Sequence, residues 1–110
     1  MRRNVLRGLL LVATLLASLG LQAAPLRISI SIPGPGAASY YPVELIPKIG
    51  ADQAEGAEVR IVFSPGGPGA VGEMLSNNVD FAVVGLPAAM SVRLTDHRVV
   101  ALAAIEERLK

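Results

Sequence analysis

Strand-like and helix-like patterns alternate along most of the chain, and this alternation restricts the possible folds more than any other feature of the sequence. Leu26–Ile32 (LRISISI) alternates apolar and polar side chains, as a strand with one buried face does. Glu58–Phe63 (EVRIVF) is a β-branched, apolar run, and Val79–Gly85 (VDFAVVG) is typical of a strand buried on both faces. Val99–Ile105 predicts a fourth strand. We therefore expect an α/β fold, a parallel sheet with flanking helices.

The segment after the first predicted strand predicts a helix. Tyr41, Leu45 and Ile49 recur every four residues, which places them on one helix face, and Gly50 is suited to end the helix. Pro47 removes a hydrogen bond inside this segment, so we expect a kinked helix or two short turns. The polar residues 51–57 lack periodicity and predict a loop.

A second helix is expected after the second strand. Val71, Met74 and Leu75 have helical spacing, with Pro68 suited to the first helical position and residues 77–78 (Asn-Asn) to the end. A third helix is expected at residues 88–94.

The N-terminus has the pattern of a secretory signal peptide. Met1–Arg7 carries three arginines and no acid, Gly8–Leu19 is apolar and uncharged, and small residues follow. We expect cleavage after Ala23, which makes residues 1–23 the signal and residues 24–110 the mature chain, located in the periplasm. The alternative is an uncleaved membrane anchor, for which the apolar core is shorter than the roughly 20 residues that span a bilayer.

Composition excludes several classes of partner and chemistry. Removal of the three signal arginines leaves seven basic residues against nine acids, a net charge near −2. Without a basic patch, and with two Tyr, two Phe and no Trp, the chain does not suit nucleic acid. It has no cysteine for disulfides or thiolate metal sites, and only one histidine. We expect no metal and no cofactor.

The stretch FSPGGPGAVGEML (residues 63–75), which we call the glycine loop, matches G-x-G-x-x-G at Gly67–Gly72. A dinucleotide fingerprint requires the glycines directly after the first strand and an acid at the end of the next strand. Here residues 64–66 intervene, and the nearby acid, Asp80, opens the third strand. A P-loop requires a lysine in the motif, and none lies between Lys48 and Lys110. We interpret the match as accidental.

The turns after Ile32, Phe63 and Val84 are nevertheless expected to open on one edge of a parallel sheet, where α/β proteins bind ligands. Unpaired N–H groups at helix starts accept carboxylate, sulfonate, phosphate or nitrate without a basic side chain. The alternative is that these Gly and Pro residues only form turns. The lack of Lys or Arg in the turns favours an anion held by backbone and hydroxyl groups, or a neutral solute.

The order of motifs also resembles a known family. LRISISIPGPGAASYYPVELIPKIG, the glycine loop and MLSNNVDFAVVGLPAAMS are similar to the N-terminal part of periplasmic solute-binding proteins of the nitrate, sulfonate and taurine type, which serve ATP-binding-cassette (ABC) importers. The resemblance extends over Leu26–Ile105. It implies the first lobe of a two-lobed receptor that captures a small solute and delivers it, as a monomer, to an inner-membrane permease.

Family ligands touch the turns after the first three strands. Carried over to this chain, the resemblance implies that the ligand-binding residues are Pro33, Gly34, Ser39, Tyr40, Ser64, Gly66, Gly67, Gly69, Gly85, Leu86 and Pro87.

Several of these residues also have an ordinary structural interpretation. Tyr40 either lines the cleft and hydrogen-bonds the solute or packs on the sheet, and Ser64 either binds an anion or caps a turn. Asp80 matches an acidic position of the family and is expected to act at the strand entrance. His97 is expected in a solvated loop.

Family members are several times longer than this chain, so we expect Met1–Lys110 to be an N-terminal fragment or the product of a truncated gene, with exposed sheet edges. Two alternatives remain. An exported enzyme of the same fold requires a nucleophile–base pair or paired carboxylates, which the sequence does not offer, so no catalytic residue is predicted. A membrane-tethered interaction module follows if the signal stays uncleaved.

Overall fold

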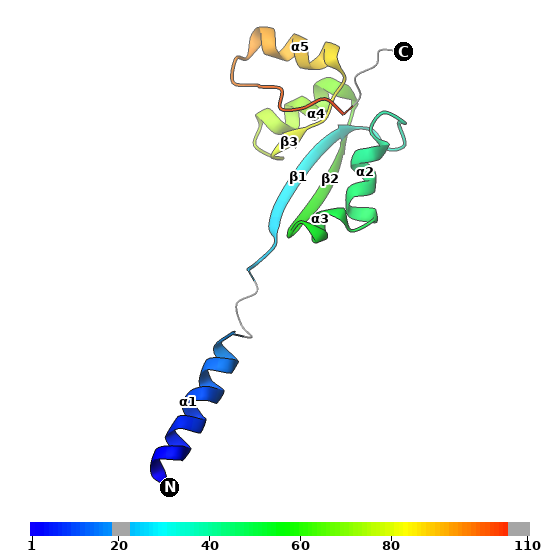
Figure 1. The fold of residues 1–110 in the computed structure, drawn as a ribbon. Coiled ribbons are helices and arrows are strands. Elements are labelled where there is room, and N and C mark those ends of the chain that lie inside the picture. The colour runs from blue at the N-terminus through cyan, green and yellow to red at the C-terminus, as the bar shows by residue number, and fades with distance from the viewer. Residues whose placement is uncertain (19–22, 106–110) are drawn as a thin grey trace.

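A three-stranded parallel sheet in the order β2-β1-β3 forms the centre of the protein (Figure 1). The computed structural model describes residues 1–18 and 23–105 of the 110-residue chain. β1 (Leu26–Pro33) pairs along its whole length with β2 (Ala57–Ser64), and at two residues with β3 (Phe81–Ala82). The predicted α/β class, with a parallel sheet and flanking helices, is confirmed.

Helices connect and cover these strands. α2 (Tyr41–Lys48) and α3 (Ala51–Ala54) pack against β2, whereas α4 (Gly66–Leu75) contacts all three strands, β1 most extensively. α5 (Leu86–Thr95) packs against α4. The crossover from β1 to β2 and the crossover from β2 to β3 run in opposite directions across the sheet. Because both are right-handed, α2 and α3 lie on one face of the sheet and α4 on the other (Figure 1).

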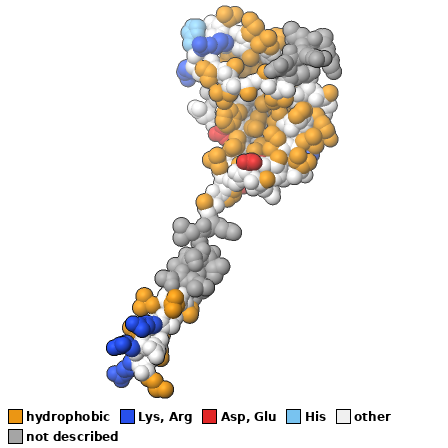
Figure 2. Space-filling model, in the orientation of Figure 1, with side chains coloured by type: hydrophobic (Ala, Val, Ile, Leu, Met, Phe, Trp, Pro, Cys, Tyr) orange, Lys and Arg blue, Asp and Glu red, His pale blue; other side chains and the backbone are white. Residues whose placement is uncertain are grey.

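The N-terminal helix α1 (Arg2–Ser18) covers most of the predicted signal segment and projects away from the sheet (Figure 1). Its arginines gather near its free end (Figure 2). Apolar side chains of the same helix, such as Leu6 and Leu9, are exposed. Within residues 1–18 and 23–105, no helix has the length and apolar character needed to cross a membrane. The predicted cleavage after Ala23 stays a prediction.

The core is small and lies where α2 and α4 meet the sheet. Its buried apolar residues are Ile32, Val43, Ala70, Val71 and Val79. Val71 faces the sheet as predicted, and α4 ends before Asn77, which adopts a left-handed φ of 58°. The helix starts at Gly66, however, so Pro68 occupies its third position and the prediction of the first was wrong.

The predictions for residues 41–57 need two corrections. Tyr41 and Ile49 are exposed, while Val43 and Glu44 are buried, so the inward face of α2 is not the predicted one. Pro47 lies inside α2, which ends one residue later. The predicted loop at 51–57 contains the short helix α3, because Gly50 reverses the chain with a left-handed φ of 72° and starts a new turn.

The strand predictions were wrong at the C-terminal side. β3 covers only two residues of the predicted Val79–Gly85, and Phe81 is 40% exposed although burial on both faces was expected. Val99–Ile105 forms no strand among the described residues, and Leu102 is 74% exposed. An apolar run becomes a strand only where it exchanges ladder hydrogen bonds with a neighbour, and within residues 23–105 this segment pairs with none of the three strands.

Candidate functional site

The carboxyl ends of the strands meet at one edge of the sheet. Pro33, the last residue of β1, is in register with Ser64, the last residue of β2. Just past the end of β3, the N–H of Val83 donates to the carbonyl of Ser31 at 2.9 Å. The turns that follow the three strands therefore lie side by side, as predicted.

Two close approaches join these turns. The Tyr40 hydroxyl lies 3.9 Å from the position that a Cβ atom on Gly85 would occupy, so the first turn meets the third. A Cβ atom on Gly67 would lie 2.8 Å from the Cβ of Ala88, so the starts of α4 and α5 touch. The Tyr40 hydroxyl thus lies at the site edge, and its contact with a ligand stays a prediction.

The glycines of the site have conformational reasons to be glycine. Gly34 and Gly66 have φ values of 62° and 71°, in the left-handed region that other residues rarely adopt. Gly67 is required by its contact with Ala88, and a Cβ atom on Gly69 would lie 3.1 Å from the Pro65 ring. The turn interpretation accounts for all four residues; contact with a ligand is an additional hypothesis.

The three helices that begin at this edge start without a side-chain cap. The residues preceding α2, α4 and α5 are Tyr40, Pro65 and Gly85, and none of them accepts a backbone N–H with its side chain. The first turns of α4 and α5 also contain no acid. At the start of α2, Tyr41 and Val43 donate their N–H groups to carbonyls of the preceding turn, so the backbone donors of this edge come from the starts of α4 and α5. Together with the positive ends of the helix dipoles, they form a surface that favours an acceptor-rich solute.

A buried pair of hydroxyl groups lies beneath the turns. Ser64 Oγ and Ser31 Oγ are 2.7 Å apart, and both residues are buried. The sequence pattern placed Ser31 on a polar, outward face, which is wrong, because α4 packs on β1. Since one hydroxyl donates to the other, one proton of the pair is left for a further acceptor.

The first turn is fixed by two hydrogen bonds. The Gly34 N–H donates to the carbonyl of Ser64 at 3.0 Å, and the Gly36 N–H donates to Glu44 Oε1 at 3.0 Å. Glu44 is 6% exposed, and its other carboxylate oxygen lies 3.6 Å from Lys48 Nζ. Sequence reasoning missed Glu44, because an acid in a short amphipathic helix normally faces solvent.

The remaining predicted residues lie in the same turns and at the helix starts that follow them. Ser39 lies in the exposed turn before α2, Leu86 is exposed at the start of α5, and Pro87 occupies the first turn of that helix.

Asp80 acts at the strand entrance. Its Oδ2 atom accepts the N–H and the hydroxyl of Ser29, both at 2.7 Å, and its own N–H donates to the Ser29 carbonyl at 3.0 Å. The Ser29 N–H, then its hydroxyl, lower the pKa of Asp80. Asp80 lies at the opposite end of β3 from the three turns.

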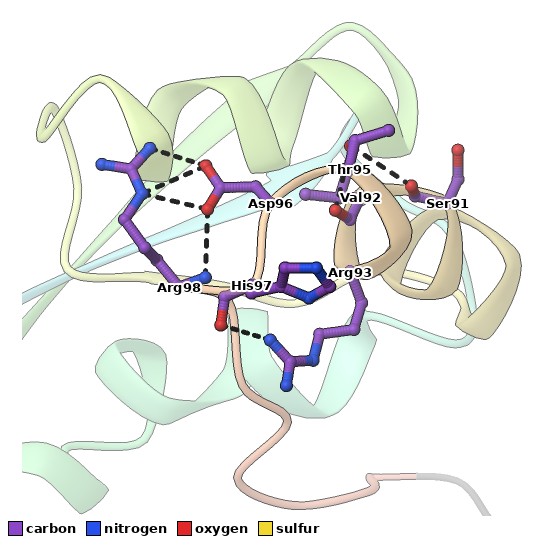
Figure 3. A network of polar contacts seen from close by, with 7 residues as sticks. All are labelled: Ser91, Val92, Arg93, Thr95, Asp96, His97 and Arg98. Carbon is purple, nitrogen blue, oxygen red and sulfur yellow. Dashed lines mark hydrogen bonds and ion pairs between the residues drawn. The ribbon is translucent and has the colours of Figure 1, made fainter.

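His97 lies beyond the C-terminal end of α5, in an exposed turn (Figure 3). Its carbonyl accepts a hydrogen bond from Arg93, while Asp96 pairs with Arg98 at 2.6 Å. Hydrogen bonds from the Arg98 side chain, then from its backbone N–H, lower the pKa of Asp96 to about 2. The charged side chains of Arg93, Asp96 and Arg98 thus bond to one another or to nearby backbone at the end of α5, away from the turns.

A groove of ≈ 470 Å³ lies elsewhere, beside β3. It is lined by the end of α4, the residues around Phe81 and the segment from Arg98 to Leu102, and none of the predicted ligand-binding residues takes part. We regard the turns as the better candidate site, since the groove is a shallow space next to an unpaired sheet edge. Within the described residues, no group of three or more His, Asp or Glu side chains is placed to hold a metal ion.

The comparisons with known proteins give no family assignment: no protein-family model, no curated protein and no solved structure matches this chain.

Proposed function

We propose that this chain belongs to the first lobe of a periplasmic solute-binding receptor of an ABC importer, and that a small solute binds at the turns after β1, β2 and β3. The observation that carries the proposal is the meeting of three strand-to-helix turns at one sheet edge, with no side-chain cap on any of the helices that start there. In open α/β sheets, this edge is the usual place for a ligand.

The chemistry of the edge defines the class of solute. It offers backbone N–H groups, the Tyr40 hydroxyl and the Ser31–Ser64 pair, and no Lys or Arg lies in the turns. Donors without full positive charge suit nitrate or a sulfonate, or a neutral solute rich in acceptors. The choice among these solutes depends on residues of an opposing lobe, which lie outside this site.

Export supports the same function. The basic start, apolar middle and small-residue exit of residues 1–23 form a signal, and α1 projects away from the sheet, accessible to the export machinery. After export, the receptor meets its solute in the periplasm and presents it to the permease as a monomer. Sequencing the N-terminus of the exported product tests this step: Ala24 first supports release, and Met1 first contradicts it.

An NMR titration of the full chain with sodium nitrate and with methanesulfonate tests solute binding. We expect amide shifts at Gly34, Gly66, Gly67 and Gly85, with a dissociation constant on the order of 1 mM, because one lobe supplies only part of a closed cleft. Shifts confined to the groove at Val99 and Val100, or no shifts at all, would contradict the proposal.

Tyr40→Phe removes one hydroxyl from the site, and Tyr41→Phe is its matched control on the neighbouring residue, which is half exposed. We expect Tyr40→Phe to weaken binding by roughly three- to tenfold, the scale of one neutral hydrogen bond, and Tyr41→Phe to leave binding unchanged. Equal effects of the two substitutions would remove Tyr40 from the site.

A further inference from the structure

In the turn between β1 and α2, the backbone N–H groups of Gly34 and Gly36 donate to acceptors that lie outside the turn itself. Gly34 and Gly36 both have left-handed φ values, 62° and 79°, so the chain makes neither helix nor ladder hydrogen bonds there. The Gly34 N–H finds its acceptor in the carbonyl of Ser64, on the second strand. The Gly36 N–H finds its acceptor in a side chain, Glu44 Oε1, eight residues later.

Glu44 also contacts the residue at the start of its own helix. Its backbone N–H donates to the Tyr40 carbonyl at 3.2 Å, while its side chain accepts the Gly36 N–H at 3.0 Å. One residue therefore holds two parts of the site edge together: the glycine turn, and the residue whose hydroxyl approaches Gly85.

The Glu44 carboxylate is buried, and both of its oxygens have partners. The side chain of Glu44 is 7% exposed, and a buried carboxylate is costly unless its oxygens are paired. Oε1 takes the Gly36 N–H, and Oε2 faces Lys48 Nζ at 3.6 Å. Lys48 in turn lies 5.8 Å from the centre of the Tyr41 ring, which holds the ammonium group over α2.

We propose that Glu44 is a positioning residue for the solute site: its carboxylate accepts the Gly36 N–H, holds the Gly34–Gly36 turn against α2 and thereby fixes the position of this turn relative to Tyr40 at the site edge. This inference rests on the proposed function. A carboxylate is a stronger hydrogen-bond acceptor than a neutral group, so the turn is preorganised before solute arrives.

Hydrogen exchange of the Gly36 amide in the full chain tests this role directly. Glu44→Ala removes the acceptor, so we expect exchange of the Gly36 amide to become about tenfold faster, the scale of one lost hydrogen bond. Glu44→Gln keeps a carbonyl oxygen in the same place and is expected to preserve most of the protection. Glu55→Ala, at an exposed acid after α3, is the control.

The Gly34 amide, which bonds to Ser64, distinguishes local from global effects. Faster exchange at Gly36 with unchanged exchange at Gly34 supports the proposal. Unchanged exchange at Gly36 in Glu44→Ala would overturn it. A common acceleration at Gly34 and Gly36 would also overturn it, because Glu44 would then stabilise the fold as a whole.

Solute affinity gives the second readout, with nitrate and methanesulfonate as probes. We expect about tenfold weaker binding in Glu44→Ala, recovered in Glu44→Gln, as for other residues that orient a binding group from behind. Unchanged affinity together with a released Gly36 amide would overturn the positioning role. If the wild-type chain binds neither anion, the proposed function fails, and Gly36 exchange still shows separately whether Glu44 holds the turn.

Discussion

Asp80 and Ser29 form a closed set of hydrogen bonds that attaches the start of β3 to the middle of β1. The carboxylate accepts the Ser29 N–H and hydroxyl, and the Asp80 N–H returns a bond to the Ser29 carbonyl. Because β3 pairs with β1 at only two residues, this side chain supplies a large part of the attachment of β3 to the sheet.

The Ser29–Asp80 pair predicts a loss of stability in acid. The pKa of Asp80 in the folded chain is below its ordinary value of 3.8, so its contribution is complete above pH 3.8 and is lost as the pH falls through the folded-state pKa. Urea unfolding between pH 2 and pH 6 should show this loss in the wild type and less of it in Asp80→Asn. Glu55→Gln is the control, and an unchanged acid dependence in Asp80→Asn would contradict the assignment.

Ser31 and Ser64 should be strongly coupled in a double-mutant cycle. Replacing either one by Ala leaves the other hydroxyl buried without its partner, which we expect to cost about 1–3 kcal/mol of unfolding free energy. The double variant should cost less than the sum of the two single variants, since no unpaired hydroxyl remains. Additive costs, measured by urea unfolding, would mean that the two hydroxyls do not interact.

Gly67→Ala and Gly72→Ala make a matched pair on α4. A methyl group at Gly67 would meet Ala88 Cβ at 2.8 Å and force α4 and α5 apart, which we expect to destabilise the fold by about 1–3 kcal/mol. A methyl group at Gly72 meets nothing within 4 Å and should stabilise the helix by about 0.5–1 kcal/mol. Thermal unfolding should thus shift in opposite directions, and shifts of the same sign would contradict the packing of α4 on α5.

The Asp96–Arg98 pair predicts that removal of the Arg98 side chain returns the pKa of Asp96 toward its ordinary value. The pKa of Asp96 is about 2 because Arg98 donates hydrogen bonds to its carboxylate. In Arg98→Ala the pKa of Asp96 should rise toward 3.8, as followed by the ¹³C shift of its carboxyl carbon. Arg93→Ala removes a hydrogen bond to the carbonyl of His97 and should leave the pKa of Asp96 unchanged. An equal rise of the Asp96 pKa in both variants would mean that the overall positive charge of the region, and not the Asp96–Arg98 pair, lowers this pKa.

The sequence by itself determined the class of fold and the common edge of the turns. The alternation in LRISISI and the β-branched run EVRIVF defined β1 and β2 to within one residue at each end, because local side-chain periodicity reports directly on a strand. The Gly and Pro residues after Ile32 and Phe63 placed the turns correctly, since only a few residue types tolerate the backbone angles required there.

Tertiary structure alone decided which residues are buried and which apolar runs become strands. Val99–Ile105 has the composition of a strand but pairs with no other segment among the described residues, and pairing is a property of two segments. Ser31 and Glu44 look like surface residues in the sequence. Ser31 is buried where α4 packs on β1, and the Glu44 side chain is buried beside the turn after β1. Each has a hydrogen-bond partner that lies far from it along the chain or across a turn. The positions of these partners depend on the packing of the whole sheet, which no local pattern encodes.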